Sequence, residues 1–190
     1  MDATLIRSCG LGLLAGFLAA ALWRDLASYR IPNAVVFSGT AAALILHAAL
    51  PEGYGLLSSV PGALGPGASL AGLGIGLAAL LPLYLIRAAG AGDAKLMAMA
   101  GAFLGASDAL GAVFATYLAG MAIALLAMTR AGVAASAARN LRLIAYGAFA
   151  RLAAIEGPRF DPRADCAARL PYSSAIALGT AGWCAWRLWT

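Results

Sequence analysis

Residues 68–86 read ASLAGLGIGLAALLPLYLI and contain no charged side chain. A helix needs about 20 mostly apolar residues to cross the hydrocarbon core of a bilayer. Inside the bilayer, the backbone N–H and C=O groups of such a run are satisfied by the helix's own hydrogen bonds. The stretch therefore predicts a membrane-spanning helix at Ala68–Ile86.

The composition of the whole chain agrees with that prediction. Of its 190 residues, 63% are hydrophobic and 11% are charged, and the mean hydropathy is +0.86. A soluble domain has about 25% charged residues, so the composition argues against a soluble globular enzyme and against disorder. The net charge of +5 comes without a dense basic stripe, which argues against nucleic-acid binding. We expect one all-α, polytopic domain over residues 1–190, embedded in a lipid bilayer.

Further apolar runs predict about six transmembrane helices. They are Leu5–Trp23, Ala34–Leu50, Ala68–Ile86, the short run Asp93–Ala106, Ala109–Thr129 and Pro171–Trp189. The Gly/Pro-rich stretch Glu52–Gly67 is predicted to be a loop. Pairs of glycines four positions apart, at 12/16 and at 72/76, predict close helix packing. An alternative stays open at the start, because Met1–Trp23 also looks like a secretory signal.

Basic residues in the connections set the orientation. Eleven Lys and Arg lie in the connections that follow the first, third and fifth spans, and only Arg7 and Arg187 lie on the opposite side. Cytoplasmic loops carry the excess of Lys and Arg, so we expect both termini outside and the three basic loops in the cytoplasm. Residues 130–169 are too polar to span, and their apolar residues recur on one helical face. They predict a cytoplasmic amphipathic loop at the interface.

The sequence predicts neither a metal site nor a cofactor. Cys9, Cys166 and Cys184 lie far apart and form no C-x-x-C pair. The single histidine, His47, lies within an apolar run, and we expect a hydrogen-bonded helix residue there rather than a metal ligand.

Two of the eight acidic residues stand apart from the others. Asp25 closes the first span and Asp93 opens the fourth, so the predicted topology puts both at the cytoplasmic side. Two close carboxylates share one proton, so one can take a proton from water while the other polarises a scissile carbonyl. On spacing alone, two solvated helix-end residues remain the alternative. The other six acids are expected in solvated loops or tails: Asp2, Glu52, Asp108, Glu156, Asp161 and Asp165.

The neighbours of Asp93 have expected roles as well. Gly90 and Gly92 allow backbone conformations closed to other residues and leave room for an extended substrate strand. Lys95 has two open interpretations: it orients a carboxylate, or it anchors the helix at the cytoplasmic interface.

Three segments carry a resemblance to a known family. Asp25 is followed by Arg30-Ile31-Pro32-Asn33, and residues 90–96 read GAGDAKL. These segments resemble the two active-site segments of type IV prepilin peptidases, the second being G-x-G-D-x-K-L. Residues 170–172, LPY, look like the run into the family's last helix. The matches follow the family order over residues 25–179.

The resemblance implies a six-helix, GxGD-type aspartic endopeptidase of the cytoplasmic (inner) membrane, with Asp25 and Asp93 as the catalytic pair. Its implied supporting residues are Arg30, Pro32, Asn33, Gly90, Gly92 and Lys95. Such enzymes remove the short basic leader of prepilins at the cytoplasmic face. The chain resembles the short members that serve Flp-type, tight-adherence pili. It lacks the zinc-binding cysteine motifs of the larger bifunctional members, so N-methyltransferase activity is not assigned to it.

Alternatives remain. One is a presenilin-like or preflagellin aspartic protease, which shares G-x-G-D. From another class, a small proton-coupled transporter would use the two aspartates as a relay.

Overall fold

The computed structural model describes residues 3–51, 53–85, 89–132, 142 and 171–190. The chain divides into two compact units, residues 1–120 with 171–190, and residues 121–170. The helical bundle described below is the first unit. Most of the predicted amphipathic loop, residues 130–169, lies outside the described residues.

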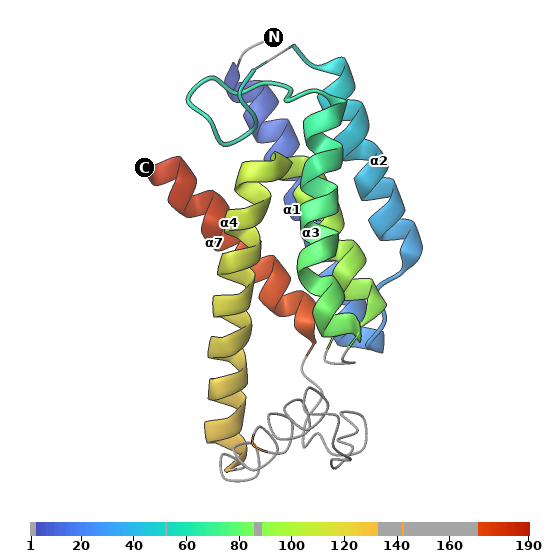
Figure 1. Cartoon of the computed structure of the whole chain (residues 1–190), viewed down its shortest axis with the longest axis vertical. Helices are drawn as coiled ribbons and strands as arrows, with labels where there is room; N and C mark the ends of the chain where they lie inside the picture. The colour runs from blue at the N-terminus through green and yellow to red at the C-terminus, as the bar shows by residue number, and fades with distance from the viewer. Residues whose placement is uncertain (1–2, 52, 86–88, 133–141, 143–170) are drawn as a thin grey trace, which may run out of the picture. The chain divides into compact units, whose positions relative to one another are not determined.

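Every element with assigned bounds is a helix, as the apolar runs predict (Figure 1). The elements are α1 (Ala3–Ser28), α2 (Asn33–Ala49), α3 (Pro66–Leu85), α4 (Ala91–Ala131) and α7 (Tyr172–Trp189). α1 packs against α2 and α7, and α2 packs against α3. The all-α prediction is therefore confirmed.

The fourth and fifth predicted spans are joined within α4 by one glycine. Gly105 has φ 78° and ψ 176°, which breaks α4 into the arms 91–104 and 106–131. Only glycine adopts that conformation readily. Figure 1 shows α4 reversing direction between its two arms. The reversal needs no loop, so the second arm begins directly after the first.

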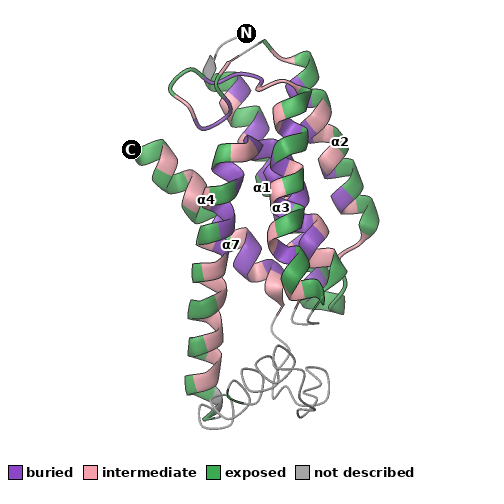
Figure 2. Ribbon diagram, viewed as in Figure 1, coloured by how far each residue is buried: buried purple, intermediate pink, exposed green. Residues whose placement is uncertain are grey.

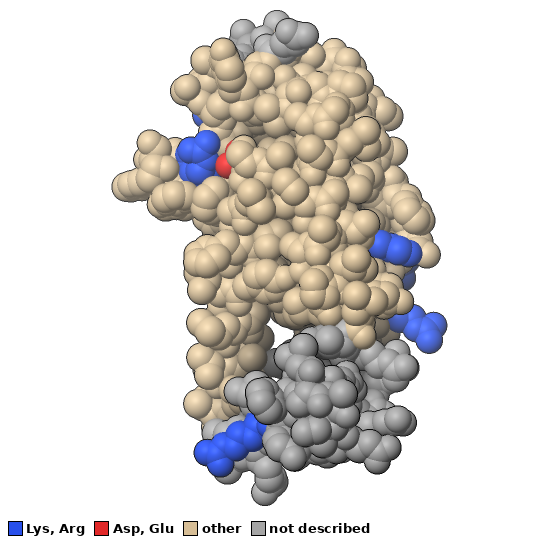
Figure 3. Space-filling model, viewed as in Figure 1, with Lys and Arg blue, Asp and Glu red and all other residues tan. Residues whose placement is uncertain are grey.

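Among the residues that the structure describes, three helices are long and apolar enough to cross a bilayer. They are α1 from Thr4, α3, and α4 as far as Arg130, whereas α2 is apolar but shorter. Large side chains such as Ile45, Leu85 and Phe114 are more than half exposed, and Figure 3 shows a broad uncharged surface over the bundle. Such a surface is suited to lipid rather than water. The chain is a membrane protein, and the number of six crossings stays a prediction.

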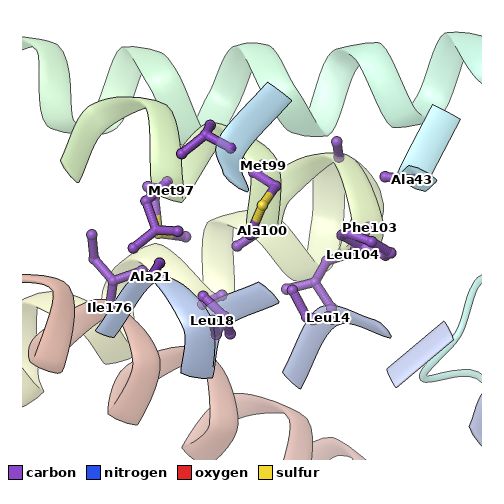
Figure 4. Close-up of a cluster of buried hydrophobic side chains, with 14 of the residues drawn as sticks. Leu14, Leu18, Ala21, Ala43, Met97, Met99, Ala100, Phe103, Leu104 and Ile176 are labelled. Atoms are coloured by element: carbon purple, nitrogen blue, oxygen red, sulfur yellow. The ribbon is translucent and has the colours of Figure 1, made fainter. Parts of the chain in front are cut away.

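The core is built around the first arm of α4. Met97, Met99 and Phe103 of this arm are fully buried, and Figure 2 shows the buried residues along the inner faces of the helices. Figure 4 shows α1 contributing Leu14 and Leu18 to this cluster. Because lipid tails are as apolar as these side chains, the bundle is held by close packing and buried hydrogen bonds rather than by exclusion from water.

Glycines bring α3 against this arm. A methyl group at Gly72 would collide with the carbonyl oxygen of Gly101, and one at Gly76 would collide with that of Met97. The close packing predicted for 72/76 is therefore confirmed. The same prediction for Gly12 and Gly16 is wrong within the described part of the chain, since an added methyl group there meets nothing within 4 Å.

His47 makes two buried hydrogen bonds. The N–H of Leu64 donates to Nδ1 at 3.2 Å, so Nε2 carries the ring proton and donates to the carbonyl oxygen of Phe103 at 2.9 Å. The ring thus ties the connection between α2 and α3 to the end of the first arm of α4. His47 is a hydrogen-bonded helix residue, as expected.

Asp108 departs from its predicted place in a solvated loop. Its carboxylate is buried and accepts hydrogen bonds of 3.1 Å from Trp183 Nε1 and from Arg187 Nε, the latter within an ion pair. The prediction is wrong because the turn at Gly105 is so short that position 108 already lies in the second arm, facing α7.

Candidate functional site

Asp25 lies in the last turn of α1, where the chain turns into α2. The carbonyl oxygen of Asp25 accepts the N–H of Tyr29 at 2.7 Å, and Tyr29 adopts a left-handed conformation with φ 50°. Pro32 then precedes α2 with an extended backbone, and its carbonyl oxygen accepts the N–H of Val35 at 3.1 Å. Pro32 is thus the N-cap residue of α2, a position where its fixed φ and missing N–H cost no helical hydrogen bond.

Asp93 lies in the first turn of α4 and caps it. The N–H of Gly90 donates to Asp93 Oδ2 at 2.9 Å, and the N–H of Asp93 donates to the Gly90 carbonyl at 3.1 Å. This is the side-chain half of a capping box, which satisfies a backbone donor that the helix itself leaves free. A methyl group at Gly92 would lie 3.2 Å from Ile31 Cβ, so the small residue lets the two segments approach.

The two segments form a pocket of about 290 Å³. Seven residues line it: Asp25, Tyr29, Arg30, Ile31, Gly90, Gly92 and Asp93. Asp25 is 7% exposed, and Asp93 lines the same pocket. Residues 68 positions apart thus share one pocket, as the sequence predicted for Asp25 and Asp93.

Three of the predicted supporting residues do not line the pocket. Lys95 Nζ donates to Asn33 Oδ1 at 3.1 Å and lies 5.6 Å from the centre of the Phe37 ring. The interpretation that Lys95 orients a carboxylate requires a contact between the two groups. No such contact is present among the described residues. Pro32 is the N-cap residue of α2, and Asn33 accepts the hydrogen bond from Lys95.

Ser173 contacts the site, and the sequence did not point to it. Its hydroxyl donates to Asp25 Oδ2 at 2.5 Å, and its own exposed fraction is 0%. The sequence marks the preceding LPY segment but holds no signal that joins a serine to an aspartate 148 positions away.

The arrangement can perform acid–base hydrolysis. Two carboxylates in one pocket share a proton, and the pocket is large enough for a short stretch of extended peptide and a water molecule. Within the described ranges, no group of three His, Cys, Asp or Glu side chains is placed to hold a metal ion.

Comparison with known proteins places this site in a family. Searches of curated proteins and of solved structures found no match. A model of the type IV leader peptidase family matches residues 12–125, which is more than half of the chain and includes Asp25 and Asp93. The chain therefore belongs to the type IV leader peptidase family.

Proposed function

We propose that this peptidase is an aspartic endopeptidase that removes the short basic leader from type IV prepilins of the Flp-like class. Asp25 and Asp93 are its catalytic pair. The observation that supports this most directly is the pocket that both carboxylates line. In the reaction, one carboxylate takes a proton from water, and the other donates a proton to the scissile carbonyl oxygen.

Supporting features surround the pair. Gly90 and Gly92 line the pocket without side chains of their own, which suits a substrate whose backbone lies extended. An extended strand is required because a helix uses its carbonyl groups in its own hydrogen bonds. Arg30 lines the same pocket and supplies a positive charge beside the two carboxylates.

The proposed location is the cytoplasmic membrane, with the pocket facing the cytoplasm. The distribution of basic residues supports it, since Arg24 and Lys95 lie near the pocket end of their helices and Arg30 lies in the connection between α1 and α2. A basic leader that stays in the cytoplasm would then reach the carboxylates without crossing the bilayer.

Co-expression with candidate prepilins tests the proposal, scored by a gel shift and by sequencing the new N-terminus. Asp25→Asn and Asp93→Asn should each reduce cleavage by at least about a hundredfold, because Asn cannot exchange a proton. Asp108→Asn is the matched control, since it makes the same chemical change outside the pocket and should retain cleavage. Cleavage near the wild-type rate in either pocket variant would reject the dyad.

A further inference from the structure

The contact between Ser173 and Asp25 distinguishes the two aspartates. Ser173 Oγ lies 2.5 Å from Asp25 Oδ2, and both residues are buried. A hydroxyl that donates to a carboxylate makes a stronger hydrogen bond than one between two neutral groups. The contact therefore gives Asp25 a donor suited to the carboxylate form, which is the form that takes a proton from water.

Asp93 has a different kind of partner. Its oxygen accepts the backbone N–H of Gly90 at 2.9 Å, an ordinary length for a neutral donor, and its side chain is only partly buried. A protonated carboxyl group keeps such a contact through its carbonyl oxygen while its O–H donates elsewhere. Asp93 can hold a proton without losing its place at the start of α4.

The start of α7 adds a second favourable interaction for the charge on Asp25. Ser173 lies in the first turn of α7, and no side chain caps this turn. The free N–H groups of a first turn make the N-terminal end of a helix positive. Because Ser173 holds Asp25 at this turn, the carboxylate gains from the helix as well as from the hydroxyl.

We propose that Ser173 is a positioning residue that holds the Asp25 carboxylate in place as the base for water, while Asp93 is the acid of the pair. The inference rests on the proposed function and assigns the two roles within it. Asp25 takes a proton from water as the water oxygen bonds to the carbonyl carbon, and Asp93 protonates the carbonyl oxygen. As the C–N bond then breaks, Asp25 returns its proton to the nitrogen, and Asp93 recovers one from a hydroxyl of the diol.

A series at position 173 tests whether activity follows the donor rather than the volume. Ser173→Ala and the nearly isosteric Ser173→Cys, a weak donor, should each lower kcat by about ten- to a hundredfold with little change in KM. Ser173→Thr keeps a hydroxyl and should retain more activity than both. Ser174→Ala is the matched control, because the Ser174 hydroxyl donates to the Pro171 carbonyl at 2.7 Å. Its kcat should equal that of the wild type.

A thermal-melting cycle in detergent gives a readout that needs no substrate. Ser173→Ala should lower Tm more in the wild-type background than in the Asp25→Asn background, because a bond to a charged acceptor is stronger than one to an amide. Equal shifts in both backgrounds would overturn the inference, as would a wild-type kcat in Ser173→Ala. If the wild type cleaves no prepilin, the proposed function fails while the melting cycle still decides the Ser173–Asp25 coupling. If the wild type and Ser173→Ala cleave equally well, only the inference fails.

Discussion

Lys95 of α4 donates a hydrogen bond of 3.1 Å to Asn33 at the start of α2. Lys95 is the lysine of the G-x-G-D-x-K-L match. It thus binds the side-chain amide of Asn33, which follows the other segment that forms the pocket. The bond joins the two helix starts that lie on either side of the pocket. We expect this bond to fix the spacing of the pocket walls, while in the proposed mechanism the aspartates carry out the proton transfers.

Removing this bond should affect stability more than chemistry. Lys95→Met keeps most of the side-chain length, and we expect it to lower the free energy of unfolding by about 0.5–1 kcal/mol, because the bond is exposed to solvent. Asn33→Ala should produce a similar loss, and the double variant should lose less than the sum of the two. Melting curves and cleavage rates measured on the same preparations check this. A loss of cleavage in Lys95→Met as complete as that in Asp93→Asn would assign the lysine to the chemistry instead.

His47 should be a major stabilising residue far from the reaction. His47→Ala removes two hydrogen bonds and opens a cavity, which together cost about 2–4 kcal/mol of stability. His47→Phe fills most of the space without the bonds and separates the two contributions. Thermal melting is the measurement, with cleavage assayed well below the melting temperature. An unchanged melting temperature in both variants would contradict the role of His47 in holding the connection at Leu64.

The proposed orientation can be measured by cysteine labelling in a background that lacks the three native cysteines. That background is needed because Cys9 is exposed and would react itself. Val60→Cys, at a position 56% exposed, should react with an impermeant reagent in intact cells. Phe160→Cys, outside the described residues, should react only after permeabilisation. The opposite result would place the basic loops outside and remove the charge-based argument for a cytoplasmic pocket.

Cleavage should survive both EDTA and the removal of all three cysteines. A pair of carboxylates activates water without a metal. Cys9 and Cys184 do not line the pocket, and Cys166 lies outside the described residues. The informative comparison is the cysteine-free variant assayed with and without the chelator. Inhibition by EDTA that added metal reverses would refute the mechanism proposed above.

Much of the fold could be predicted from the sequence, because backbone groups in lipid must bond within their own helix. The run Ala68–Ile86 accordingly predicted α3, which spans Pro66–Leu85. The shared pocket of Asp25 and Asp93 followed from the direction in which each span runs. The first prediction depends only on hydrogen bonds within one apolar run. The second depends only on the alternating direction of successive spans.

The side-chain partners could not be predicted in this way. The pattern of apolar residues gives the length of a helix but not the direction that each polar side chain faces in the bundle. Ser173 was therefore not predicted as a site residue, and Asp108 was predicted to be solvated although α7 covers it. Gly12 and Gly16 show the same limit, since their spacing matches that of Gly72 and Gly76 while no neighbouring helix approaches them in the described structure.

The single-glycine reversal at Gly105 has a consequence for changes in chain length. A helix turns about 100° per residue, so one residue inserted or deleted after Gly105 would rotate the whole second arm by that angle. Thr116, which contacts Met97 of the first arm, and Tyr117, which bonds the Ala79 carbonyl, would then face other directions. A long loop would absorb such a change, but this turn has no spare residues. The segment between Asp93 and Gly120 should thus tolerate substitutions far better than insertions or deletions, and an epitope tag is best placed elsewhere.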